Sequence, residues 1–119
     1  MAQSRTHSGG CHCGRVRYEV ATELSAVLDC NCSICRKRGM LWTFVEAKDF
    51  KLLAGEAELV DYQFNKRIIH HLFCRACGVT SFARGRGADG SEAVGINVRC
   101  LDDVDLAGLT LTPYDGRSR

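Results

Sequence analysis

The sequence predicts a mainly β domain with little helix. Most segments alternate polar and apolar residues with a period of two, which is the pattern of a half-buried strand. These segments are rich in β-branched and aromatic residues, and turn-forming residues separate them. The helical pattern is confined to a few short stretches, so a helical architecture is not expected.

The predicted strands follow one another along most of the chain. In the segment 15–20, Val16, Tyr18 and Val20 fall on one face and charged residues fall on the other. Further strands are predicted over 41–47, 57–64, 68–73, 79–83 and 93–101. Turns are predicted at Gly9, around Gly55, at Asn65 and, as a hairpin loop, over 84–90.

Two short helical turns are expected between the strands. The segment 32–38 can form one or two turns before Gly39 stops them. Asp49 is placed to cap a short turn over 48–50.

Length and composition indicate one globular domain over 1–119. Apolar residues make up 45% of the chain and charged residues 25%, which is close to the globular average. No apolar run approaches the roughly 20 residues that cross a bilayer, so no membrane partner is expected. The N-terminal segment is polar and lacks the apolar core of a signal peptide, which predicts a cytoplasmic protein.

Eight cysteines in a reducing compartment favour metal binding or catalysis over disulfides. A disulfide framework is the alternative if the chain is exported. The formal net charge of +2 counts every thiol as neutral, whereas thiols bound to zinc are deprotonated. The mild basicity would then vanish, and the longest run of like charge is only 36–38, so no nucleic-acid partner is expected.

Two cysteine pairs have the spacing of half a zinc site each. Cys11 and Cys13 would face the same side of an extended strand. Cys74 and Cys77 form a C-x-x-C turn, in which Gly78 can adopt positive φ and backbone N–H groups can point at the sulfurs. The simplest partition joins both pairs into one structural site with four thiolates.

A third group, Cys30, Cys32 and Cys35, supplies three ligands within six residues. Three protein ligands are the number found in catalytic zinc sites that keep one position open. A closed site would need a fourth ligand. The candidates are Cys100, His70, His71, His12 and an external molecule.

Zinc that carries three thiolates is a weaker Lewis acid than zinc held by neutral histidines, so binding a soft sulfur is favoured over generating hydroxide. Arg36, with the adjacent basic residues, could meet substrate carboxylates or belong to a solvated turn. Trp42 could wall the pocket or pack in the core. Asn97 and Arg99 would share a strand face and could contact a ligand.

The segments "GGCHCGRVRYEV", "CNCSICRKRG", "HLFCRACGVTSFARG" and "INVRCLD", together with Y-x-F at 62–64, resemble the glutathione-dependent formaldehyde-activating enzyme family, which also contains centromere protein V. The resemblance covers a core of about 9–103. It implies a β-tent of twisted antiparallel sheets stapled by two Zn²⁺. The structural ion would be held by Cys11, Cys13, Cys74 and Cys77, and the catalytic ion by Cys30, Cys32 and Cys35.

The resemblance implies an enzyme that makes or breaks a carbon–sulfur bond. Its named activity condenses glutathione with formaldehyde to S-hydroxymethylglutathione. The leading hypothesis is therefore a carbon–sulfur lyase acting on a small thiol such as glutathione. The alternative is a non-catalytic zinc module that binds a protein or nucleic acid, as centromere protein V suggests.

Overall fold

The computed structural model describes residues 5–24, 27–63, 69–86 and 90–115, and in these the chain is mainly β, as predicted. The smaller sheet has three strands in the order β1 (Arg5–Gly10), β2 (Arg17–Thr22) and β5 (Phe50–Ala54). The larger sheet has seven, in the order β10 (Leu111–Tyr114), β3 (Val27–Cys30), β4 (Trp42–Glu46), β9 (Glu92–Asn97), β8 (Phe82–Arg86), β7 (His70–Cys74) and β6 (Leu59–Tyr62). Neighbouring strands are antiparallel except β10 and β3, which are parallel.

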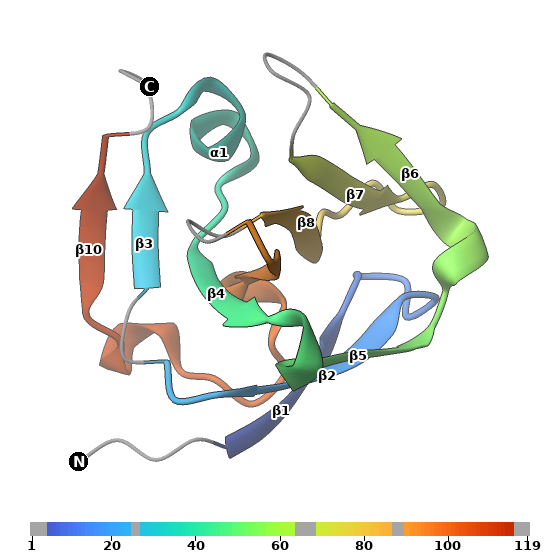
Figure 1. Cartoon of the computed structure of the whole chain (residues 1–119), viewed down its shortest axis with the longest axis horizontal. Helices are drawn as coiled ribbons and strands as arrows, with labels where there is room; N and C mark the ends of the chain where they lie inside the picture. The colour runs from blue at the N-terminus through green and yellow to red at the C-terminus, as the bar shows by residue number, and fades with distance from the viewer. Residues whose placement is uncertain (1–4, 25–26, 64–68, 87–89, 116–119) are drawn as a thin grey trace.

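Helix α1 (Ser33–Arg38) is the α-helix of the described residues, and it ends where it was predicted to end. Its C-cap, Gly39, has φ of 68°, a left-handed conformation that glycine adopts at little cost. Figure 1 shows α1 above the end of β3, with β10 beside β3 on one side and β7 and β6 on the other. Single 3-10 turns form η1 (Ala47–Asp49), η2 (Glu56–Glu58), η3 (Val98–Cys100) and η4 (Leu106–Gly108).

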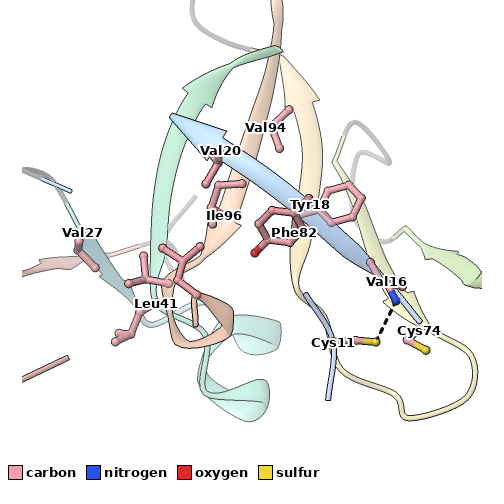
Figure 2. Close-up of a cluster of buried hydrophobic side chains, with 12 residues drawn as sticks. Cys11, Val16, Tyr18, Val20, Val27, Leu41, Cys74, Phe82, Val94 and Ile96 are labelled. Atoms are coloured by element: carbon pink, nitrogen blue, oxygen red, sulfur yellow. Dashed lines mark hydrogen bonds between the residues drawn. The ribbon is translucent and has the colours of Figure 1, made fainter. Parts of the chain in front are cut away.

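The main core lies where β2 packs against the larger sheet. Val16, Tyr18 and Val20 are at most 1% exposed, which confirms the predicted alternation. The Tyr18 ring packs at 5.7 Å from the ring of Phe82, edge to face. Figure 2 shows this cluster extending from Val27 and Leu41 at one end to Cys11 and Cys74 at the other.

Several predicted boundaries are wrong. Gly9 lies inside β1 rather than in a turn, because β1 pairs with β2 along its whole length. The predicted strand over 93–101 ends at Asn97, whose side chain caps η3 by accepting the Arg99 backbone N–H. Asp49 lies within η1 and does not cap it; the N-cap is Glu46.

Other predictions are only partly covered by the described residues. The hairpin loop predicted over 84–90 does join two antiparallel strands, but its predicted start is wrong, because β8 continues to Arg86 and pairs there with Glu92 of β9. Residues 87–89 of that loop, Phe64 and the turn predicted at Asn65 lie outside the described residues. No helix in the described part of the chain is long and apolar enough to span a membrane.

Candidate metal centres

Four cysteines from two distant segments form one cluster, which we call the four-cysteine cluster. Its members, as predicted from spacing, are Cys11, Cys13, Cys74 and Cys77. Their sulfurs all lie within 4.8 Å of one another. The cluster joins the hairpin between β1 and β2 to the turn after β7.

The sulfur spacing of this cluster fits a tetrahedral zinc ion. The Cys13 sulfur lies 3.5 Å from that of Cys11 and 3.6 Å from that of Cys74. Four sulfurs at the usual Zn–S distance of about 2.3 Å would be separated by about 3.8 Å. The donor set and the spacing therefore both suit Zn²⁺.

Backbone N–H groups point at the sulfurs of the four-cysteine cluster. The Val16 N–H donates to Cys11 Sγ at 3.3 Å, as Figure 2 shows. Gly78 has φ of 79°, as predicted for the C-x-x-C turn. The segment with Cys11 and Cys13 is a turn and not the extended strand that was predicted, because the chain reverses there between β1 and β2.

The thiols of this cluster differ in their affinity for protons. The backbone N–H and the guanidinium of Arg15 lower the pKa of Cys13 to about 6. Burial raises the pKa of Cys74 to about 11. For Cys77, burial acts upward, but backbone N–H groups of Val79 and Cys13 outweigh it and lower the pKa.

The second group, the three-cysteine cluster, consists of Cys30, Cys32 and Cys35, whose sulfurs also lie within 4.8 Å of one another. Cys30 ends β3, Cys32 is the N-cap of α1, and Cys35 lies within the helix. The Cys32 N–H donates to Cys30 Sγ and the Cys35 N–H donates to Cys32 Sγ, each at 3.5 Å. The short connection between β3 and α1 thus brings the three sulfurs close together.

The three thiols of this cluster also differ in the direction of their pKa shifts. Burial raises the pKa of the Cys30 thiol and that of the Cys35 thiol. Burial acts in the same direction on Cys32, but hydrogen bonds from the side chain and backbone of Cys35 outweigh it and lower the pKa of Cys32. Cys32 is therefore the most acidic of the three thiols, whereas a bound zinc ion would deprotonate all of them.

Trp42 contacts this cluster directly. Its indole N–H donates to Cys35 Sγ at 3.1 Å, and both side chains are buried. Ile34, Met40 and Ala83 pack around the pair. Trp42 therefore combines the two roles considered for it, because it packs in a core and also touches a candidate ligand.

Among the described residues, no fourth Cys, His, Asp or Glu joins the three-cysteine cluster. The Cys100 thiol is directed at the Thr80 carbonyl at 3.8 Å, and burial raises its pKa to about 11. His70 Nδ1 lies 2.6 Å from Asp61 Oδ2. His71 lies in β7 and His12 is exposed, and neither belongs to a cluster.

A pocket of about 380 Å³ lies beside the three-cysteine cluster. Cys30 and Cys35 line it, together with the exposed residues Arg36 and Arg99. Within the described ranges, neither guanidinium forms an ion pair. Two guanidinium groups and the Asp29 carboxylate therefore line the same pocket as the sulfurs of Cys30 and Cys35.

Asn97 does not line this pocket. It is buried, its Oδ1 accepts from Leu41 N–H and Arg99 N–H, and its Nδ2 donates to the Thr80 carbonyl at 2.9 Å. The strand face that Asn97 and Arg99 were predicted to share does not exist, because η3 begins between them. A substrate contact through Asn97 remains a prediction.

Sequence reasoning missed Asp29, Asn31 and Thr80. Asp29 and Asn31 line the pocket, and Thr80 accepts hydrogen bonds from Arg38, Asn97 and Cys100. No motif marks these residues: Asp29 and Asn31 are neighbours of Cys30 in the sequence, and Thr80 lies in the loop before β8. Only the position of Asp29 and Asn31 on either side of Cys30 could have suggested a role.

Two comparisons with known proteins gave a match over most of the chain. A family profile described as glutathione-dependent formaldehyde-activating enzyme matches residues 6–113. The crystal structure of a protein from Rhodobacter sphaeroides, determined by the Northeast Structural Genomics project, superposes with a TM-score of 0.78. It is 33% identical, and the alignment covers 90% of this chain and 98% of that one.

Proposed function

The chain belongs to the glutathione-dependent formaldehyde-activating enzyme family, and from this premise we propose that it is a zinc-dependent carbon–sulfur lyase. Its substrate would be an adduct of glutathione or of another small thiol. The observation that carries the proposal is the three-cysteine cluster, which has no fourth protein ligand among the described residues and borders, through Cys30 and Cys35, a pocket that Arg36 and Arg99 also line.

The two clusters would have different roles. The four-cysteine cluster would hold a structural zinc ion, because two of its members, Cys11 and Cys74, are buried in the main core. The three-cysteine cluster would hold the catalytic ion, which when bound supplies a position for a soft sulfur ligand and stabilises its thiolate form.

Arg36 and Arg99 would bind the carboxylates of the substrate. Glutathione carries two carboxylates, and guanidinium groups pair with them through strong charge-assisted hydrogen bonds. Both arginines line the same pocket as Cys30 and Cys35, so a bound carboxylate would hold the thiol near the cluster. Asp29 in the same pocket offers a partner for the substrate ammonium group.

The reaction balances without an oxidant or reductant. In the synthetic direction the thiolate sulfur adds to the aldehyde carbon, and the electron pair of the carbon–oxygen π bond moves to oxygen. The oxygen then takes up one proton, which balances the proton that the thiol lost. The chain contributes by orienting the thiol beside the cluster, which accelerates such additions.

The test measures formation of S-hydroxymethylglutathione above its spontaneous rate, by NMR exchange spectroscopy with protein loaded with two zinc ions per chain. We expect acceleration by the native protein and by Cys100→Ala, which alters a cysteine outside both clusters. Cys32→Ala should abolish it. If no thiol tested is turned over and Cys32→Ala changes nothing, the protein is a non-catalytic zinc module and the proposal is wrong.

A further inference from the structure

Trp42 and Cys35 form a buried hydrogen bond between a side chain and a candidate metal ligand. The two atoms, Nε1 and Sγ, are 3.1 Å apart, and the residues are 5% and 7% exposed. An indole N–H can only donate, so the sulfur is the acceptor. The sulfurs of Cys30 and Cys32 accept from backbone N–H groups, which a side-chain substitution does not remove. The donor to Cys35 is a side chain, so a substitution can remove it.

The indole ring of Trp42, which lies in β4, packs over the backbone of the neighbouring strand β9. In the register of β4 and β9, Phe44 pairs with Gly95 and Trp42 pairs with Asn97. A Cβ added at Gly95 would lie 3.2 Å from Trp42 Cε3 and 3.1 Å from Phe44 Cε1, so both rings lie over the bare glycine backbone. The two rings are stacked, with centroids 6.4 Å apart and planes at 22°.

These contacts leave the indole little freedom to turn away from the sulfur. The ring lies against the Gly95 backbone, and its N–H is directed at Cys35 Sγ. A group that orients a metal ligand in this way usually acts on the metal through that ligand. Phe44 itself is 59% exposed, whereas Trp42 is 5% exposed, so the stacked pair has one buried and one exposed ring.

We propose that Trp42 is a positioning residue of the three-cysteine site, which rests on the proposed zinc-binding role of that cluster. Its N–H fixes the direction of the Cys35 sulfur lone pairs, so that Cys35 converges with Cys30 and Cys32 on one ion. The close contact of the indole ring with the Gly95 backbone keeps the donor in place. Trp42 thus acts through Cys35 and need not touch the substrate.

The first test compares Trp42→Phe with Phe44→Leu, each loaded with two zinc ions. Trp42→Phe keeps an aromatic ring but loses the donor, and zinc bound at the three-cysteine site should weaken by roughly 10- to 100-fold in chelator competition. With Co²⁺ in place of Zn²⁺, the sulfur-to-metal charge-transfer band should shift. Phe44→Leu keeps the donor and should change both readouts far less.

Either of two results would overturn the proposal: unchanged metal affinity in Trp42→Phe, or an equal loss in Phe44→Leu, which would assign the effect to packing. If Trp42→Phe does not fold, the native protein decides. It has a single tryptophan, so its indole N–H gives one assignable NMR signal. Slow hydrogen exchange and a shift on zinc loading support the bond, whereas exchange as fast as in free indole contradicts it.

None of these readouts uses turnover. If the lyase activity is absent but the metal affinity falls in Trp42→Phe, the proposed function fails and the positioning role stands. If the native protein has the activity but Trp42→Phe binds zinc as tightly as the native protein, the proposed function stands and the positioning role fails.

Discussion

Arg38 donates a hydrogen bond from Nη1 to Oγ1 of Thr80, which joins the end of α1 to the loop after the C-x-x-C turn. Arg38 lies three residues beyond Cys35, and Thr80 lies three residues beyond Cys77. The two cysteine clusters are therefore connected through one polar contact. The Arg38 guanidinium also lies over the ring of Phe73, at 5.4 Å from its centroid.

Replacing Thr80 with Val should remove this contact while keeping the side-chain volume. Thr80 is buried and its partner is charged, so the free energy of unfolding should fall by about 1.5–3 kcal/mol. Urea denaturation of the zinc-loaded protein measures it. Thr112→Val, on the exposed strand β10, should stay within about 0.5 kcal/mol of the native protein. Equal midpoints for the two variants would show that the Arg38 contact contributes nothing.

The two clusters should respond differently to loss of one ligand. Cys74→Ser removes a fully buried ligand of the four-cysteine cluster, and structural zinc contributes on the order of 10 kcal/mol, as much as a whole domain's net stability. We expect an unfolded chain by circular dichroism. Cys32→Ser should instead retain the fold and bind one zinc ion by elemental analysis. An unfolded Cys32→Ser or a folded Cys74→Ser that still binds two ions would contradict the assignment of roles.

The cysteine spacing predicted both clusters because ligand geometry is set locally, over two or three residues. C-x-C and C-x-x-C restrict where sulfurs can point, whichever sheet they belong to. The predicted strand at Cys11 was wrong, yet the two sulfurs still converge, because a turn also brings residues two apart to one side. The burial of Tyr18 followed from a two-residue period in the same way.

β1 was missed because its glycines were interpreted as a turn, whereas the other missed strands have no pattern of their own. β10 contains Pro113 and is exposed throughout, so it is defined by its pairing with β3 rather than by alternation. β5 and β3 are short and only partly buried. The contacts of Trp42 and Thr80 depend on the register between β4, β9 and β8, which the sequence alone does not specify.

Asn97 provides a test that separates a structural role from a substrate contact. Its buried side-chain amide forms hydrogen bonds with the backbone of Leu41, Arg99 and Thr80. Asn97→Ala should therefore lower the free energy of unfolding by about 1–3 kcal/mol for the buried groups it leaves unpaired. If Asn97 contacts substrate instead, stability should be nearly unchanged and the KM for glutathione should rise.

Arg99 should affect substrate binding rather than stability. Arg99→Gln removes one of the two guanidinium groups that line the pocket, and a lost charge-assisted hydrogen bond of about 1.5 kcal/mol raises KM for glutathione roughly tenfold. A thiol without carboxylates, such as 2-mercaptoethanol, should show no such change. Arg75→Gln, an exposed arginine paired with Glu58, is the matched control. An equal effect on both thiols would remove Arg99 from the carboxylate site.

Tyr18 should make the protein sensitive to alkali. Its hydroxyl donates to the Ser81 carbonyl at 3.0 Å, and burial raises its pKa well above the usual range. Because the folded-state pKa exceeds the unfolded one, the buried phenol stabilises the fold below about pH 10, and this contribution is lost as the pH rises further. Tyr18→Phe cannot ionise, so it lacks this pH dependence.

At pH 8, Tyr18→Phe should be less stable than the native protein by about 1–3 kcal/mol, because the buried Ser81 carbonyl loses its donor. Above about pH 10 the native protein should lose stability faster, so the difference should shrink, by up to about 1.4 kcal/mol per pH unit. Urea denaturation of zinc-loaded protein across this pH range measures both curves. Tyr114→Phe, which alters an exposed tyrosine, should run parallel to the native protein. A gap between native protein and Tyr18→Phe that stays constant with pH would mean that Tyr18 ionises as readily in the folded state as in the unfolded chain.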